Sequence, residues 1–145
     1  FFLNSSFLAK KAIKEYANNK VYKEYVAIVD GKFIEEMKIT IPITTIKGKT
    51  ARSKIDRENG KPATTMIYPN QVEGNKSKVK IIIENGRTHQ IRVHCQAVNF
   101  PIVGDGIYGK KVQQANRMLL HSKVTRIFHY EFIAEEPKEF YTFGF

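Results

Sequence analysis

Two stretches of the chain carry the residue patterns of β-strands. In residues 21–29 apolar and polar side chains alternate, as they do in a strand that presents two different faces. The alternation places one set on a single face: Lys23, Tyr25, Ala27 and Val29. Residues 79–84 contain three consecutive isoleucines, which is typical of a strand inside a sheet. Asn85-Gly86 should end that strand, because both residues tolerate positive φ.

Two segments have the period of an amphipathic helix. Ile91, Cys95 and Val98 recur at spacings of four and three residues and form one apolar stripe. We expect this helix to begin at Thr88, whose hydroxyl is suited to an N-cap. A similar stripe in residues 5–17 predicts an earlier helix. Both stripes would pack on a sheet.

The remaining segments predict more strands and one long loop. Apolar runs indicate strands at residues 33–43, 63–68, 119–128 and 139–143. Residues 63–68 and 79–84 should pair through a connection that contains Gly74-Asn75, and Pro42 indicates a sheet edge or a bulge. Residues 44–62, rich in Thr, Lys and Gly, predict a mobile basic loop. The resulting fold class is α+β, a mixed, mainly antiparallel sheet with helices packed on it.

Length and composition indicate the number of domains and the kind of binding partner. A chain of 145 residues with 42% hydrophobic content is expected to form a single domain, 1–145. The formal net charge of +10 favours a polyanionic partner, with nucleic acid ahead of membrane because no basic amphipathic helix of membrane type is evident. The alternative is that the lysines only keep the protein in solution. With no apolar run of membrane length and no secretory leader, we expect a cytoplasmic protein.

Cysteine usage argues against metal chemistry. Cys95 is the only cysteine, so a disulfide within the chain is excluded. One thiol and scattered histidines do not make a metal cluster, and we expect no metal. Cys95 lies on the apolar stripe, which predicts a small buried hydrophobe.

The segment after residues 79–84 is dense in hydrogen-bond donors. Residues 86–94 are Gly-Arg-Thr-His-Gln-Ile-Arg-Val-His. Arg87 precedes the expected helix, and Arg92 lies one turn after Thr88 on a second stripe. Free N–H groups at a helix start attract phosphate or carboxylate, so the two guanidiniums could serve two different anions. Alternatively, Gly-Arg is an ordinary solvated helix start, and His94 alone is more typical of a packed histidine than of a ligand.

Three ordered segments resemble the RluA family of pseudouridine synthases, which act on large-subunit ribosomal RNA and transfer RNA. Residues 86–94, with Pro-Ile-Val-Gly-Asp at 101–105 and Tyr108-Gly109, resemble the longest motif of that family. Residues 23–29 are similar to its Lys-x-Tyr-x-Ala-x-Val strand, and residues 117–122 to its Arg-Leu-x-Leu-His-Ala strand. The resemblance covers nearly all of the chain. It implies the C-terminal part of a catalytic domain, RNA as the partner, and no cofactor.

The resemblance also implies roles for individual residues. Isomerisation of uridine breaks the C1′–N1 bond and rejoins the base through C5, which calls for an ionised carboxylate, a cation beside it and a flat surface for the extruded base. Tyr25 matches the tyrosine of the family. Arg92 is our choice for the cation, because a helix side chain held by packing positions a charge better than a turn does. Expected substrate-binding residues are Arg87, which is also the second choice for the cation, His89, Gln90, Leu120 and Lys23.

The carboxylate of the resembled family has no match here. In that family a His-Arg-Leu-Asp motif lies a short loop upstream of the strand that Phe1-Phe2-Leu3 would match. We therefore expect a truncated chain that is inactive by itself. Asp30, Asp56 and Asp105 correspond to a turn, an insertion and a structural loop, and none is assigned the role. Asp105, between two glycines, is expected to cap its own loop.

Two other function classes can be compared with the sequence. The same basic surface suits an RNA-binding module without catalysis, and the sequence that precedes Phe1 would discriminate between the two. A Rossmann-type nucleotide enzyme is disfavoured, because the glycines lack Gly-x-Gly-x-x-Gly spacing after the first strand.

Overall fold

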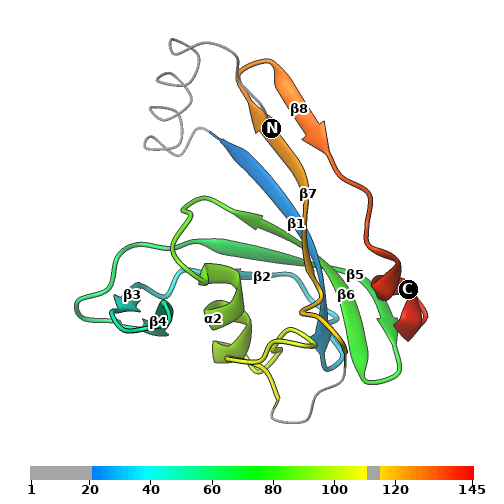
Figure 1. The fold of residues 1–145 in the computed structure, drawn as a ribbon, viewed down its shortest axis with the longest axis horizontal. Coiled ribbons are helices and arrows are strands. Elements are labelled where there is room, and N and C mark those ends of the chain that lie inside the picture. Colours follow the sequence, from blue (N-terminus) through cyan, green and yellow to red (C-terminus); the bar gives the residue numbers. More distant parts are fainter. Residues whose placement is uncertain (1–20, 111–114) are drawn as a thin grey trace.

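The computed structural model describes residues 21–110 and 115–145 (Figure 1). The helix expected at residues 5–17 and the strand fragment at the start of the chain lie outside these ranges. Within them, a six-stranded sheet has the order β2-β5-β6-β1-β7-β8, and all of its neighbours are antiparallel. Its strands are β1 (Tyr22–Asp30), β2 (Met37–Ile39), β5 (Thr65–Glu73), β6 (Lys76–Ile83), β7 (Leu120–Ile127) and β8 (Tyr130–Ile133). The other elements are the hairpin of β3 (Ile43–Ile46) and β4 (Arg52–Ile55), the helix α2 (Gln90–Ala97) and the 3₁₀ helix η1 (Lys138–Phe143). The α+β class with a mainly antiparallel sheet is confirmed.

Strand β1 lies in the middle of the sheet and has a buried set of side chains on each face. Ala27 and Val29 belong to the main core with Ile91 and Cys95 of α2. Val26 and Ile28 pack on the opposite face with Phe140 of η1. The predicted alternation is therefore confirmed. Tyr25 packs against the same cluster as Ala27, so it points to the side of the sheet that α2 covers.

The start of α2 differs from the prediction. The N-cap is His89, whose φ is 53° and whose side chain makes no capping hydrogen bond. The prediction that Thr88 is the N-cap is therefore wrong. The side chain of Gln90 folds back and its Oε1 accepts the backbone N–H of Arg87 at 3.1 Å, which fixes the turn that precedes the helix. The carbonyl of Thr88 instead accepts the Ser53 hydroxyl at 2.6 Å. The apolar stripe of Ile91 and Cys95 is buried as predicted.

Three segments were assigned wrongly from the sequence. Residues 44–62 contain the β3–β4 hairpin, since the β-branched run Thr44-Thr45-Ile46 favours a strand more than the flanking Gly and Lys oppose it. Only Met37–Ile39 of the strand expected at 33–43 pairs with the six-stranded sheet. Ile43 belongs to β3 instead, and the N–H of Phe33 donates to Ser77 Oγ at 2.8 Å. Residues 139–143 belong to η1, where Pro137 is the N-cap. The strand β8 was not predicted.

Gly104 allows a close approach between two segments. Its φ is +83°, and a Cβ on it would lie 2.1 Å from the carbonyl oxygen of Arg117. We expect Gly104→Ala to lower the free energy of unfolding by about 2 kcal/mol, measured by urea denaturation. Gly106→Ala is the matched control, because a Cβ there meets open space, and it should change stability by less than about 0.5 kcal/mol. Equal midpoints for the two variants would contradict this account.

Candidate active site

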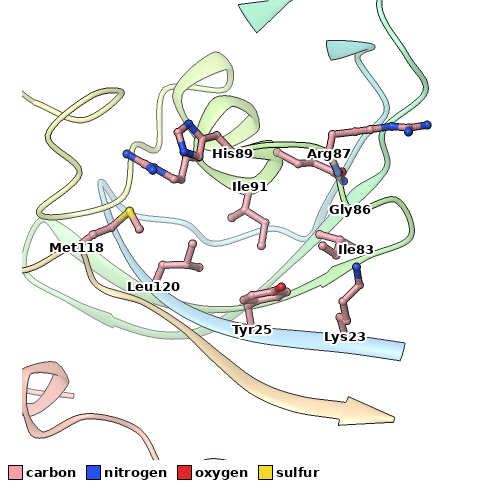
Figure 2. Close-up of a pocket in the computed structure, with 11 residues that line it drawn as sticks. Lys23, Tyr25, Ile83, Gly86, Arg87, His89, Ile91, Met118 and Leu120 are labelled. Atoms are coloured by element: carbon pink, nitrogen blue, oxygen red, sulfur yellow. The ribbon is translucent and has the colours of Figure 1, made fainter. Parts of the chain in front are cut away.

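A pocket of about 330 Å³ lies between β1, the start of α2 and the segment that enters β7 (Figure 2). Both catalytic candidates, Tyr25 and Arg92, line it. The remaining residues assigned from the sequence also line it: Lys23, Arg87, His89, Gln90 and Leu120. The structure therefore brings together side chains from three separate motifs.

The inner surface of the pocket is apolar. Tyr25 and Leu120, from neighbouring strands, pack against the main core cluster, to which Ile83 and Ile91 belong. Figure 2 shows Tyr25, Leu120 and Ile91 directed into the same space. A flat ring beside aliphatic side chains is a surface on which a planar base can stack.

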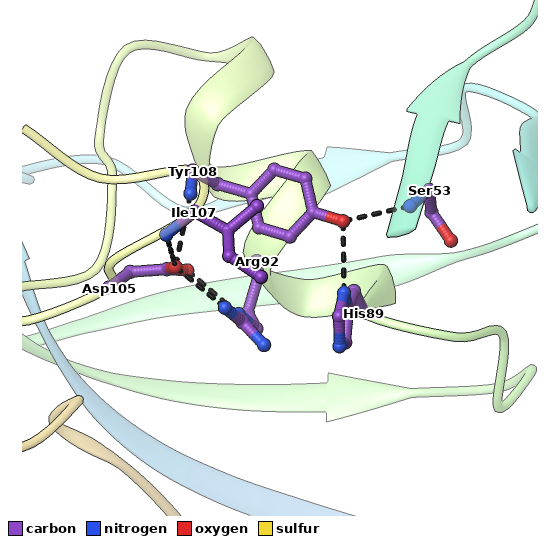
Figure 3. Close-up of polar contacts among 6 residues, drawn as sticks. All are labelled: Ser53, His89, Arg92, Asp105, Ile107 and Tyr108. Carbon is purple, nitrogen blue, oxygen red and sulfur yellow. Dashed lines mark hydrogen bonds and ion pairs between the residues drawn. The ribbon is translucent and has the colours of Figure 1, made fainter. Parts of the chain in front are cut away.

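Arg92 is held by a buried carboxylate (Figure 3). Its Nε donates to Oδ2 of Asp105 at 2.8 Å and its Nη2 to Oδ1 at 2.7 Å. The side chain of Asp105 is 1% exposed and that of Arg92 is 15% exposed. This bidentate pair fixes the plane of the guanidinium. It leaves Nη1 and one N–H of Nη2 unused by Asp105, so Arg92 retains donors for a second anion.

Asp105 also organises its own loop. Its Oδ1 accepts the backbone N–H groups of Ile107 and Tyr108, each at 3.0 Å, so the predicted loop cap is confirmed. Burial by itself would raise the pKa of Asp105, but the hydrogen bonds from Arg92 and these N–H groups hold it below its ordinary value. The same contact raises the pKa of Arg92. Both groups are therefore charged at neutral pH. The pair was missed in the sequence, where no periodicity relates residues 92 and 105.

Tyr108 connects this loop to the helix start. Its hydroxyl lies 2.9 Å from Nδ1 of His89 and accepts the backbone N–H of Ser53 at 2.8 Å (Figure 3). Its ring also faces the guanidinium of Arg92, 5.1 Å from the ring centroid. Sequence reasoning included Tyr108 in the motif but gave it no role. The pKa of His89 is lowered by burial and by the nearby charge of Arg92.

Gln90 and His94 hold the helix on the sheet. Gln90 is 2% exposed, and its Nε2 donates to the Thr64 carbonyl at 2.9 Å and to Thr65 Oγ1 at 3.1 Å. Fully buried His94 contacts Thr65 Oγ1 at 2.7 Å and the Ile41 carbonyl at 2.8 Å, which confirms a packed histidine. Gln90 was expected to bind substrate; in the described part of the chain its hydrogen bonds are all within the protein, to Arg87, Thr64 and Thr65.

Arg87 and Lys23 lie at the edge of the pocket. The Nε of Arg87 donates to the Pro62 carbonyl at 2.8 Å, and Figure 2 shows its guanidinium turned away from Tyr25. The ammonium of Lys23 lies 2.8 Å from the position that a Cβ on Gly86 would take, so the glycine makes room for it. Burial lowers the pKa of Lys23.

A second hollow adjoins the pocket on the side of the β3–β4 hairpin. It has a volume of about 480 Å³ and includes Lys47, Lys61 and Arg87 in its lining. Arg87 lines both hollows. Cationic side chains thus continue from the pocket along the hairpin, in an arrangement suited to the phosphates of a nucleic-acid strand.

Three further features of the described residues concern possible metal ligands, the thiol of Cys95 and the length of the helices. In residues 21–110 and 115–145, His, Cys, Asp and Glu form no group of three that could hold a metal ion. Cys95 is fully buried as predicted, and burial raises the pKa of its thiol to about 12, so it remains protonated. None of the helices in the described ranges is long and apolar enough to cross a membrane.

Comparisons with known proteins agree on one family. The model of the RNA pseudouridylate synthase family matches residues 2–97. An uncharacterized RNA pseudouridine synthase of Helicobacter pylori strain J99 is 46% identical over 91% of this chain and 53% of its own length. Ribosomal large subunit pseudouridine synthase D of Buchnera aphidicola is 40% identical over 74% of this chain and 33% of its own length.

A solved structure supports the same grouping. The human RNA pseudouridylate synthase domain containing 1 superposes with a TM-score of 0.81 and 29% identity, covering 92% of this chain and 62% of that chain. The chain spans about half the length of the curated Helicobacter pylori relatives.

Proposed function

Because this chain belongs to the RNA pseudouridylate synthase family, we propose that the full-length protein isomerises uridine to pseudouridine in ribosomal or transfer RNA. The observation that supports this most is the single pocket in which Tyr25 and the ion-paired Arg92 lie together. Such an enzyme would act on its RNA in the cytoplasm. The reaction is internally balanced: C1′–N1 breaks, C1′–C5 forms, and the proton of C5 is replaced by one gained at N1. It needs no cofactor.

The apolar surface is the proposed site of the extruded uracil. Stacking on Tyr25, beside Leu120 and Ile91, would offset part of the cost of removing the base from its stack. The hydroxyl of Tyr25 also provides a group that can handle a proton near the base.

The proposed catalytic carboxylate lies outside the 145 residues. The three aspartates of the chain all have other partners: Asp30 with Lys76, Asp56 with Thr44 and Asp105 with Arg92. Within the described residues, no Asp or Glu lines the pocket. The donors of Arg92 that Asp105 does not use would face the missing carboxylate and favour its ionised form.

The hairpin side of the pocket is the proposed path of the RNA backbone. Lys23, Arg87 and the lysines of the second hollow would bind phosphates, which positions the RNA without reading its sequence. Recognition would then depend on the shape of the RNA.

Deletion of the gene tests the proposed function. We expect mapping of pseudouridine in total RNA to show the loss of one or a few sites, restored by the full-length gene. Tyr25→Ala should fail to restore them because the stacking ring is absent. Tyr130→Ala, on β8 and 51% exposed, is the control and should restore them. An unchanged map would instead support the non-catalytic RNA-binding module.

The 145-residue chain is expected to be inactive by itself. Incubated with RNA from the deletion strain, it should form no pseudouridine, while the full-length protein should. Isomerisation by the chain alone would show that its own residues supply the carboxylate, and that the assignment above is wrong.

A further inference from the structure

We propose that Tyr108 is a positioning residue that holds His89 in one tautomer, with its Nε2–H as a hydrogen-bond donor for a carbonyl oxygen of the pyrimidine in the pocket. The inference rests on the proposed function only for the identity of that ligand. It begins from the hydroxyl of Tyr108, which lies between Ser53 and His89 (Figure 3).

The backbone amide of Ser53 decides which atoms donate and which accept in these hydrogen bonds. The N–H of Ser53 is 2.8 Å from the Tyr108 oxygen and can only donate. The hydroxyl proton of Tyr108 therefore needs a different acceptor. Within residues 21–110 and 115–145, the other polar atom that contacts this oxygen is Nδ1 of His89, at 2.9 Å. Because Tyr108 is only 7% exposed, a hydroxyl proton without an acceptor would be costly, so Tyr108 donates to Nδ1.

This direction of donation assigns the proton of the imidazole. If Nδ1 accepts, a neutral ring carries its proton on Nε2. The ring is kept neutral by partial burial and by the positive charge of Arg92, which lower the pKa of His89, while the smaller effect of the Asp105 charge opposes them. His89 is thus a neutral donor at physiological pH.

The direction of the donor is also fixed. The backbone of His89 has φ 53°, and its carbonyl accepts the N–H of Val93 at 2.9 Å as part of the helix. The hydroxyl of Ser53 holds the preceding carbonyl, that of Thr88, at 2.6 Å. The ring meets that of Tyr108 edge to face, with centroids 5.5 Å apart. Figure 3 shows the second ring nitrogen of His89 on the side away from Tyr108, and His89 lines the pocket.

A base in the pocket would present its oxygens to this donor. Figure 2 shows His89 and Tyr25 on opposite sides of the pocket. When C1′–N1 breaks, the electron pair stays on the uracil and is shared with its O2 and O4 oxygens. A preorganised neutral donor near one of these oxygens stabilises that charge. The cationic side chains nearby are better suited to binding phosphates than to binding a base oxygen.

The test uses full-length protein with ¹⁵N-labelled histidine. NMR of the ring nitrogens should show His89 protonated at Nε2 and not at Nδ1 at pH 7, with its signals identified by their loss in His89→Gln. Tyr108→Phe keeps the ring that faces Arg92 and removes only the hydroxyl, so both tautomers should appear. Tyr141→Phe, 61% exposed on η1, is the matched control and should leave the His89 signals unchanged.

Kinetics complete the test. Tyr108→Phe should lower kcat about tenfold with KM changed less than about twofold, because the donor acts on charge that develops in the transition state. A proton on Nδ1 in the wild type, or an unchanged tautomer in Tyr108→Phe, would overturn the proposal. A raised KM with normal kcat would assign the donor to a phosphate instead. The tautomer result does not depend on isomerase activity, so failure of the proposed function is recognised separately.

Discussion

Arg92→Ala in the full-length protein is expected to lower the rate of pseudouridine formation by about a hundred- to a thousandfold. The reason is that, under the proposed function, the guanidinium would no longer keep the proposed catalytic carboxylate ionised beside the sugar. RNA affinity should change less than about threefold, because the proposed phosphate contacts come from other cations. Single-turnover formation of pseudouridine and filter binding of the same RNA measure the two quantities.

The alanine variant also removes the partner of a buried carboxylate, so a gentler substitution is needed. Arg92→Lys keeps a positive charge near Asp105 but cannot offer two edges to two carboxylates. It should therefore fold, with a thermal midpoint near that of the wild type, and still lose about a hundredfold in rate. Arg126→Lys, in an exposed ion pair with Glu131 on the neighbouring strand, is the matched control for the chemistry of the substitution.

Arg87 provides the competing assignment. Arg87→Lys should raise KM for RNA and leave kcat close to normal, since Arg87 is directed to the hairpin side of the pocket. If Arg87→Lys loses rate and Arg92→Lys does not, the cation that pairs with the carboxylate is Arg87, which was our second choice.

The parts of the fold predicted correctly are those encoded in local periodicity. The alternation along β1 places Tyr25 on the face of Ala27, and the spacing of Ile91 and Cys95 puts α2 on the same side of the sheet. The two elements contribute Tyr25 and Arg92 to one pocket. The direction in which each side chain points follows from the period of the strand or helix that carries it.

The errors arose where a local preference competes with a distant contact. Thr88 has the side chain of an N-cap, but its carbonyl is bound by Ser53, and the left-handed turn at His89 moves the helix start to Gln90. In residues 44–62 the Gly and Lys content predicts a loop, but the β-branched run Thr44-Thr45-Ile46 forms β3 and pairs with β4. Such contacts depend on which segments meet, and that information is absent from a short sequence window.

The contacts that hold the site together are also long-range. Asp105 follows Arg92 by 13 residues. Tyr108 lies outside any helix or strand, and its partner Ser53 is 55 residues away on β4. Asp105 was expected only to cap its loop. The structure adds the ion pair with Arg92, so one short loop positions both the arginine and the histidine of the pocket.

Asp105→Asn should be the most destabilising of these substitutions. It keeps the size of the side chain but leaves the guanidinium of Arg92, 15% exposed, without its anion. We expect the free energy of unfolding to fall by about 3 kcal/mol at pH 7, measured by urea denaturation. Glu131→Gln removes a carboxylate from an exposed pair with Arg126 and should change stability by less than about 1 kcal/mol. Similar losses for both variants would contradict the buried-pair account.

The pH dependence of that difference identifies its cause. The pKa of Asp105 is depressed in the folded state, so its contribution is fully present above the ordinary aspartate pKa of about 4 and is lost as the pH falls through the lower, folded-state value. The stability gap between wild type and Asp105→Asn should therefore be constant from neutral pH down to about pH 5 and narrow below about pH 4. Loss of shape complementarity alone would leave a gap that does not change with pH. A narrowing gap, together with a lower kcat in Asp105→Asn, would show that the charge that stabilises the loop is the one that positions Arg92.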